Sequence, residues 1–441
     1  MDPLNTKHIL YTQFDTFLAG PSKKGPFTGF VNDSIFVEDG ERWSFHRALL
    51  RPQFARQHIA HLDNLEVITN DLLKCIPGDG TSVDLQQYFL DVALDSATAL
   101  FFGESAGAVQ HRLALLRGET PDHPWGAKFS SAFDICQALL LIKFFYRNFH
   151  AWYNPQELID AKKECFGIVD NFIHKAIRKH GKAARAAKAS KPDVEADETG
   201  SKRRYIFLEE LVKYSEDVEL LRGTIIGLLV AGRGPIAKTL AFTFHCLVRY
   251  PEAQEKLRKE IYEHFGSEFD RSRITFESLK ACKYLRWVID ESLRLYPSVP
   301  FDARTASKDT YLPHGGGPDG MSPIFIPKGS AVEYVPYAAH RRLDIFGPDA
   351  NWFRPERFET LSQEMARGTE HGAWTYIPFN AGPRTCVGQQ MSLTEVSYVI
   401  VRMFQHFEKF ENGEFSQFVK LDMSLNMGLG GQGARVRSFA K

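Results

Sequence analysis

Hydrophobic residues along most of this chain recur at steps of three and four, the spacing that places them on one face of an α-helix. These steps predict helices over Trp43–Phe54 and Asn64–Leu73, and a longer amphipathic helix over Pro155–Arg178. The segment Val218–Val248 is apolar over most of its length, which is typical of a buried central helix. The pattern therefore predicts a mainly helical chain.

The C-terminal half adds two helices and a small β-region. A helix is predicted from Phe276 to Tyr296, and a last helix over Gly388–Phe407. Short strands fit Pro323–Ile326 and Ala331–Val335, because each is bounded by Pro or Gly. In the helix predicted from Phe276 to Tyr296, one face carries Leu279, Cys282, Leu285, Ile289 and Leu293.

A charged segment at residues 182–204 interrupts the helical pattern. It is charged, lacks aromatic residues and contains Pro192 and Gly200, so we expect a solvated internal loop. A nucleic-acid-binding arm is the alternative, but acidic residues interrupt the basic ones. The loop does not split the chain convincingly, and no internal repeat is visible, so we expect residues 1–441 to form a single domain.

Composition narrows the class of protein. The chain is 44% hydrophobic and 24% charged, with 54 basic and 54 acidic side chains, which excludes a disordered chain and gives no electrostatic reason to expect nucleic acid as a partner. The six cysteines are scattered without a C-x-x-C pair, which favours neither a disulfide framework nor a zinc site. The N-terminus has no apolar signal region, and no stretch has the uninterrupted apolar length of a membrane span.

The strongest motif has the order F-x-x-G-x-R-x-C-x-G. Its fixed positions are Phe379, Gly382, Arg384, Cys386 and Gly388. A thiolate bound to a haem iron needs nearby backbone N–H groups, glycines where the chain passes the flat macrocycle, and a cation for a propionate. A structural cysteine in a Gly-rich turn is the alternative, but it does not account for all five positions together.

With this motif the sequence resembles the cytochrome P450 superfamily, which implies a helical prism around a buried haem b whose iron is bound by the Cys386 thiolate. Glu291 and Arg294 match the family's E-x-x-R pair, 92 residues before the cysteine counted from the arginine, and their spacing places them on one helix face. The resemblance implies a buried ionic triad of these two residues with Arg357. We expect this triad to be structural.

The family resemblance also identifies partners for the haem propionates. Trp43 and Arg47 match the family's W-x-x-x-R pair, and Arg304 follows the helix that bears Glu291. Together with Arg384 these residues would place three cations and an indole donor around two carboxylates.

Other stretches resemble the fungal alkane and fatty-acid hydroxylases, among them R-A-L-L-R-P-Q-F from Arg47 and Y-A-A-H-R-R from Tyr337. This resemblance implies a monooxygenase that inserts oxygen from O2 into a C–H bond of a long alkyl chain, a fatty acid or a fungal secondary metabolite. It also implies electrons from NADPH through a separate NADPH–cytochrome P450 reductase, a location at the surface of the endoplasmic reticulum membrane, and a monomer.

The central helix departs from this branch. Relatives read A-G-R-D-T-T-A, where an acid and an alcohol guide protons to dioxygen, but here residues 231–237 read A-G-R-G-P-I-A. In the oxygen-groove segment, Gly232 is retained, whereas Gly234 replaces the acid and Pro235 the first threonine. Pro235 is expected to kink the helix because it lacks an N–H. Thr239, one turn later, either holds a water or only packs.

Three interpretations of this departure stay open. Substrate hydroxyls or ordered water deliver the protons, the enzyme has moved to dehydration or isomerisation, or the copy is a non-catalytic haem-binding protein. A second departure is at the start, because the sequence begins after the position of the relatives' N-terminal anchor and first strands. We expect either a longer natural chain or a shortened sheet.

Overall fold

Helices dominate the computed structural model, which describes residues 2–55, 62–121, 124–182, 205–366, 372–413, 419–431 and 433–441. The prediction of a mainly α fold with a small β-region is confirmed. The predicted charged loop at residues 182–204 lies outside the described residues except for Lys182. The longer helices are α2 (Gly20–Phe27), α3 (Gly40–Leu50), α5 (Asp63–Cys75), α6 (Leu85–Phe102), α7 (Ala108–Leu116), α8 (Pro124–Tyr146), α9 (Gln156–His180), α12 (Val218–Leu247), α13 (Pro251–Phe265), α15 (Lys283–Leu295), α18 (Arg357–Ala366) and α20 (Gln389–His406). Shorter ones are α1 (Pro3–Lys7), α11 (Phe207–Val212), α14 (Phe276–Ala281), α16 (Pro336–Ala339), α17 (Leu343–Phe346) and α19 (Gly372–Thr375).

The strands form small antiparallel sheets at two sides of the helices. One sheet has the order β1-β3-β6, and a second has the order β2-β10-β7. Two hairpins, β4-β5 and β8-β9, complete the β-region. The strands are β1 (Phe17–Leu18), β2 (Asp79–Asp84), β3 (Asp302–Ala306), β4 (Thr310–Gly316), β5 (Ser322–Ile326), β6 (Ala331–Tyr334), β7 (Phe407–Asn412), β8 (Leu421–Met423), β9 (Met427–Leu429) and β10 (Arg435–Ala440).

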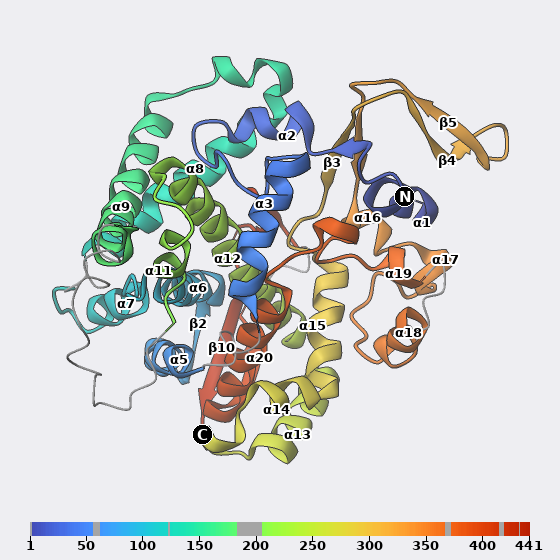
Figure 1. Cartoon of the computed structure of the whole chain (residues 1–441). Coiled ribbons are helices and arrows are strands. Elements are labelled where there is room, and N and C mark those ends of the chain that lie inside the picture. Colours follow the sequence, from blue (N-terminus) through green and yellow to red (C-terminus); the bar gives the residue numbers. More distant parts are fainter. Residues whose placement is uncertain are drawn as a thin grey trace, which may run out of the picture.

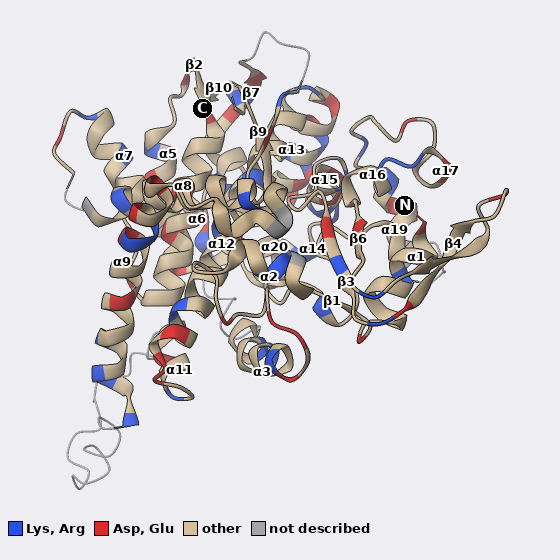
Figure 2. Cartoon of the chain, turned by 90° about the horizontal axis from the view of Figure 1, so that it is seen from above, with Lys and Arg blue, Asp and Glu red and all other residues tan. Residues whose placement is uncertain are grey.

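Helix α12 lies in the middle of the molecule and packs on α6, α9, α15 and α20 (Figure 1). The Asp217 side chain caps its N-terminus by accepting hydrogen bonds from the N–H groups of Glu219 and Leu220. Charged residues lie mainly on outer helices, and basic and acidic residues are interspersed along α9 (Figure 2). The predicted buried central helix is confirmed.

Two hydrophobic cores meet along α12. The N-terminal half, from Leu221 to Leu229, packs into a core with α6, α8, α9 and α11. The C-terminal half, from Ile236 to Val248, packs into a core with α5, α13, α15 and α20. Residues 231–235 contribute to neither core. This short stretch is therefore the part of α12 that is free to face a cavity.

The predicted helix Phe276–Tyr296 is wrong in one respect, because it is broken at Cys282 into α14 and α15. The Glu260 side chain of α13 accepts hydrogen bonds from the N–H groups of Tyr284 and Leu285, each at 2.8 Å, and so caps a new helix start. A cap supplied from another helix leaves no signal in the local hydrophobic pattern. The proline at position 235, by contrast, does not end α12, which continues through it.

Two described helices are long and apolar enough to span a membrane by length and composition, Trp125–Tyr146 of α8 and the whole of α12. The most apolar window of α12 is 78% buried within the molecule, and that of α8 is 44% buried. A buried core helix passes the same test, so these two properties alone do not identify a span.

Candidate functional site

A cavity of about 1330 Å³ lies between α12 and the loop that precedes α20. Its walls come from α3, β3, one face of α12 between Leu228 and Thr239, the loop at residues 377–388 and the β8-β9 turn. Pockets for single small molecules have volumes of about 300–1,000 Å³. The cavity is therefore large enough for a planar cofactor together with a substrate.

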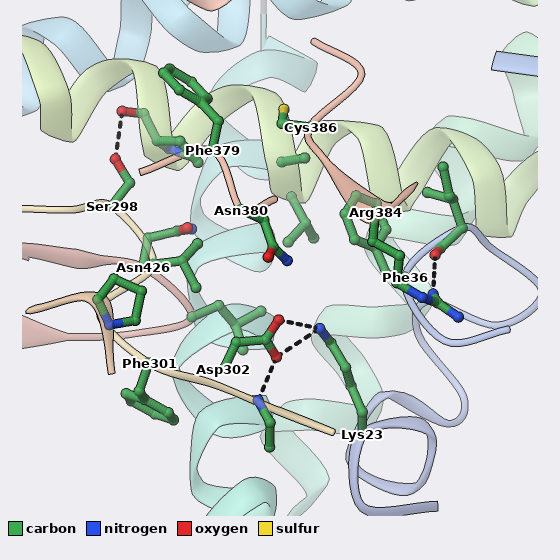
Figure 3. A pocket seen from close by; sticks show the side chains of 18 of the residues that line it. Lys23, Phe36, Ser298, Phe301, Asp302, Phe379, Asn380, Arg384, Cys386 and Asn426 are labelled. Atoms are coloured by element: carbon green, nitrogen blue, oxygen red, sulfur yellow. Dashed lines mark hydrogen bonds and ion pairs between the residues drawn. The ribbon is translucent and has the colours of Figure 1, made fainter. Parts of the chain in front are cut away.

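Cys386 is placed on the wall of this cavity (Figure 3). The other five cysteines are buried in the cores, whereas Cys386 is exposed. Its N–H donates to the Phe379 carbonyl at 2.9 Å, which fixes the loop. Although Cys386 is open to the cavity, the surrounding protein withdraws the thiol from bulk water, and this desolvation raises its pKa; the N–H of Gly388, which donates to the sulfur, and the charge of Arg47 lower it. The loop thus holds one sulfur toward open space beside groups that stabilise its thiolate.

The predicted glycines have different roles. Gly388 donates to the sulfur from the turn where α20 begins. Gly382 has a φ of +67°, and a Cβ there would lie 2.0 Å from the Leu10 carbonyl oxygen. Only glycine accepts both constraints. Gly382 therefore fits the loop against the N-terminal segment, whereas the sequence pattern suggested an approach to a macrocycle.

Four cations line the cavity beside the loop: Lys23, Arg47, Arg304 and Arg384. Arg47 donates to the Thr385 carbonyl at 2.9 Å, and Arg304 donates to Asp302 at 2.9 Å. Lys23 contacts the same Asp302 carboxylate at 2.9 Å (Figure 3). The cations Lys23 and Arg304 hold the pKa of Asp302 well below its usual range despite its burial.

Arg384 carries the clearest sign of an anionic occupant. It pairs with Asp39 at 2.5 Å and lies over the Trp43 ring at 4.9 Å, yet its Nε is buried without a partner among the described residues. Burial and the neighbouring Arg304 lower its pKa to about 10. A buried guanidinium in this position gains from a further negative charge.

The donor set fits a haem. Four cations against the carboxylates of Asp39 and Asp302 leave a net charge of +2, which two propionates would neutralise. Cys386 is the cavity-lining cysteine available to the iron. The predicted residues Trp43, Arg47 and Phe379 also line this part of the cavity.

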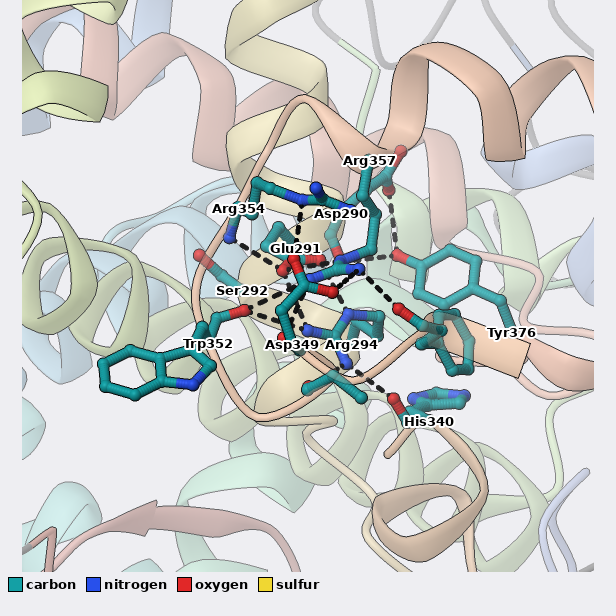
Figure 4. Close-up of polar contacts among 12 residues, drawn as sticks. Asp290, Glu291, Ser292, Arg294, His340, Asp349, Trp352, Arg354, Arg357 and Tyr376 are labelled. Carbon is teal, nitrogen blue, oxygen red and sulfur yellow. Dashed lines mark hydrogen bonds and ion pairs between the residues drawn. The ribbon is translucent and has the colours of Figure 1, made fainter. Parts of the chain in front are cut away.

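The structure brings Glu291, Arg294 and Arg357 into contact outside the cavity (Figure 4). Arg294 donates to both carboxylate oxygens of Glu291, at 2.7 and 2.8 Å, and Arg357 donates to Oε1 at 3.1 Å. Glu291 and Arg294 are completely buried. The Arg354 N–H adds a fourth donor to Glu291 at 2.9 Å. The carboxylate is thus fully paired, as a buried charge must be.

The same cluster reaches the cysteine loop through His340. Arg294 donates to the His340 carbonyl at 2.7 Å, and the Ile377 N–H donates to His340 Nε2 at 2.9 Å. Burial and the nearby Arg294 lower the pKa of His340 to about 3, so its ring is a neutral acceptor. A continuous chain of polar contacts therefore ties the triad to the start of the loop that carries Cys386.

The opposite wall is the altered part of α12, where Gly232, Pro235 and Thr239 line the cavity. Because Pro235 has no N–H, the Ala231 carbonyl receives no helical hydrogen bond. The Thr239 hydroxyl donates to the Pro235 carbonyl at 2.7 Å and lies 3.1 Å from the Ser298 hydroxyl. Thr239 is therefore engaged in direct contacts that the sequence did not predict.

Gly234 does not line the cavity, because its Cα faces the β8-β9 turn. A Cβ at this position would lie 2.6 Å from Asn426 Nδ2. The adjacent Arg233 turns away, is 2% exposed, and pairs with Asp134 and, at 2.8 Å, with Ser130. The Asn426 amide of the β8-β9 hairpin thus occupies the space beside Gly234, the position at which the family resemblance predicts an acid.

Sequence reasoning missed Lys23, Asp302, Ser298 and Asn426 as cavity residues. Asp302 lies two positions before Arg304, on the same face of β3, so strand alternation could have indicated it. The other three reach the cavity only through tertiary packing and carry no sequence signal.

Comparisons with known proteins agree with this geometry. The sequence profile of the cytochrome P450 family matches residues 1–423. Cytochrome P450 monooxygenase g430 of Fusarium sp is 40% identical over 420 residues, covering 93% of this chain and 70% of that protein. Cytochrome P450 52A3-B of Candida maltosa is 40% identical over 420 residues, covering 93% and 75%. Cytochrome P450 52A6 of Candida tropicalis is 41% identical over 410 residues, covering 92% and 74%. The chain belongs to the cytochrome P450 family, whose members bind haem through a cysteine thiolate.

Proposed function

We propose that this cytochrome P450 monooxygenase inserts oxygen from O2 into a C–H bond of an apolar substrate, with Cys386 as the ligand of its haem iron. The observation that carries the proposal is the placement of Cys386, the one exposed cysteine of the six, on the wall of a large cavity beside four cations. The cavity's exposed lining is mainly apolar, which suits a long alkyl chain, a fatty acid or a hydrophobic secondary metabolite.

When bound, the haem supplies the binding and reductive activation of dioxygen. The chain's own residues hold the group and shape the space around it. Gly388 N–H and Arg47 stabilise negative charge on the Cys386 sulfur. Arg304, Arg384 and Lys23 surround the position for the propionates. Phenylalanines of the cavity, including Phe36, exclude water from the reacting C–H bond.

Electrons are proposed to come from NADPH through a separate reductase, and the enzyme is proposed to work as a monomer at the surface of the endoplasmic reticulum membrane. These points rest on the resemblance to fungal relatives. The altered α12 supports a second candidate, dehydration or isomerisation without dioxygen cleavage, because the acid and alcohol positions hold Gly234 and Pro235.

The experiment is a reduced, carbon monoxide-bound absorption spectrum of the purified protein. Thiolate ligation gives a red-shifted Soret band, and Cys386→Ala is expected to abolish it completely. Cys282→Ala is the matched control, because this buried cysteine faces Glu260 and not the cavity. A red-shifted band that persists in Cys386→Ala would overturn the assignment. Oxygenated product formed with NADPH and reductase separates the monooxygenase from the second candidate.

A further inference from the structure

We propose that Asn426, in the turn of the β8-β9 hairpin, is a specificity residue that hydrogen-bonds an uncharged oxygen, hydroxyl or carbonyl, on an otherwise apolar substrate. The inference rests on the proposed function, because it concerns the substrate of the same cavity. Its basis is a buried carboxamide that lines the cavity and packs against Gly234 of α12.

The backbone of Asn426 is fixed from two sides. Lys238 of α12 donates to the Asn426 carbonyl at 2.7 Å and to the Ser424 hydroxyl at 2.7 Å. On the other side of the turn, the Met427 N–H donates to the Ser298 carbonyl at 2.9 Å. Lys238 lies one helical turn after Gly234, so α12 holds the hairpin directly beside the glycine. The backbone at Asn426 is therefore held by contacts that do not involve its side-chain amide.

The amide itself is left without a partner. Asn426 is 4% exposed, its Nδ2 is buried, and no described residue accepts a hydrogen bond from it. The side chain fits only because residue 234 is glycine, since a Cβ there would lie 2.6 Å from Nδ2 and 3.3 Å from Cγ. Figure 3 shows the amide end of Asn426 pointing into the cavity. An unpaired buried amide raises the free energy of the site until a ligand satisfies it.

The chemistry of the amide selects the ligand group. A carboxamide offers both an N–H donor and a carbonyl acceptor, so either a hydroxyl or a carbonyl oxygen fits it. The amide carries no charge, and Lys238, which lies beside the hairpin, already donates to the Ser424 hydroxyl and the Asn426 carbonyl. Asp422 also offsets the Lys238 charge. An uncharged oxygen therefore fits this site better than a carboxylate, whose desolvation the amide alone would not offset.

The first test uses the unmodified holoprotein. Dissociation constants are measured from the haem absorption shift for an alkane, and for alcohols, ketones and the carboxylic acid of the same chain length, with the oxygen placed at successive carbons. At one or more positions the alcohol or ketone is expected to bind roughly three- to tenfold tighter than the alkane. Equal affinity across the series, or tightest binding by the acid, would overturn the proposal without any variant.

The second test removes the amide. Asn426→Leu keeps the side-chain size but removes the amide. In this variant the dissociation constants of the alcohol or ketone and of the alkane are expected to differ by less than about twofold. Met423→Leu is the control, because Met423 lines the cavity from the same hairpin without a polar hydrogen. A preference that survives Asn426→Leu, or that Met423→Leu also removes, would contradict the role of Asn426. A full carbon monoxide band and oxygenated product formed with NADPH and reductase in these samples show that the proposed function stands even where the inference fails.

Discussion

The two walls of the cavity differ in how their functional groups are held. The wall that carries Cys386 is supported from outside the cavity by a fully paired cluster around Glu291 and by His340. The α12 wall has no polar side chain at Pro235, and the neighbouring hairpin places Asn426 on the cavity beside Gly234. The difference shows that the two walls are held by separate sets of contacts, so a substitution in one set need not disturb the other.

The largest expected loss of stability concerns the wall that carries Cys386. Glu291→Ala would leave Arg294 and Arg357 as buried cations without their carboxylate, at a cost of about 3–5 kcal/mol. Urea unfolding and haem content measure the result, and we expect unstable protein with little haem.

The matched control for this prediction is Lys74→Ala, which breaks the exposed Lys74–Asp71 pair and should cost less than about 1 kcal/mol. A Glu291→Ala protein as stable and haem-loaded as the control would show that the cysteine wall does not depend on the triad.

Lowering the pH is expected to reduce the free energy of unfolding, because His340, which supports the wall that carries Cys386, is held neutral in the folded protein. Its pKa is about 3 in the folded protein and about 6.5 when unfolded, so the unfolded state binds more protons between these values. Stability from this group is complete above about pH 6.5 and is lost as the pH falls, by about 2 kcal/mol at pH 5. Urea unfolding at about pH 6.5 and at about pH 5 checks this loss of stability. The His340→Gln variant should lack this part of the pH dependence. An equal loss in the variant would contradict the assignment.

A smaller loss of stability is expected from a substitution in the α12 wall. Gly234→Asp places a Cβ against the Asn426 amide and should destabilise the protein by about 1–2 kcal/mol. Asn426→Ala should relieve most of this cost, which gives a favourable coupling of about 1 kcal/mol in a double-mutant cycle of unfolding free energies. Additive effects of the two substitutions would show that residue 234 does not face the hairpin.

The sequence predicted one wall better than the other for physical reasons. The F-x-x-G-x-R-x-C-x-G motif and the Glu291–Arg294 pair are local patterns. The structure places Cys386 of the motif on the cavity wall and brings Glu291 and Arg294 into contact. The sequence also showed that Gly234 and Pro235 depart from the relatives' pattern. It did not reveal Asn426 or Lys23, because these residues are far from the motif in the chain and reach the cavity only through tertiary packing. The break at Cys282 was missed for the same reason, since its cap comes from Glu260.

The central claim is that the cysteine wall is intact while the α12 wall lacks its own proton-guiding side chains. The most direct test is the hydrogen peroxide released per NADPH oxidised, with reductase and a plain alkane, in protein whose carbon monoxide band shows full thiolate ligation. Without an acid and an alcohol at positions 234 and 235, we expect most of the NADPH to yield peroxide, and less peroxide with a substrate that carries a well-placed hydroxyl. Nearly one oxygenated product per NADPH with the plain alkane would contradict the account.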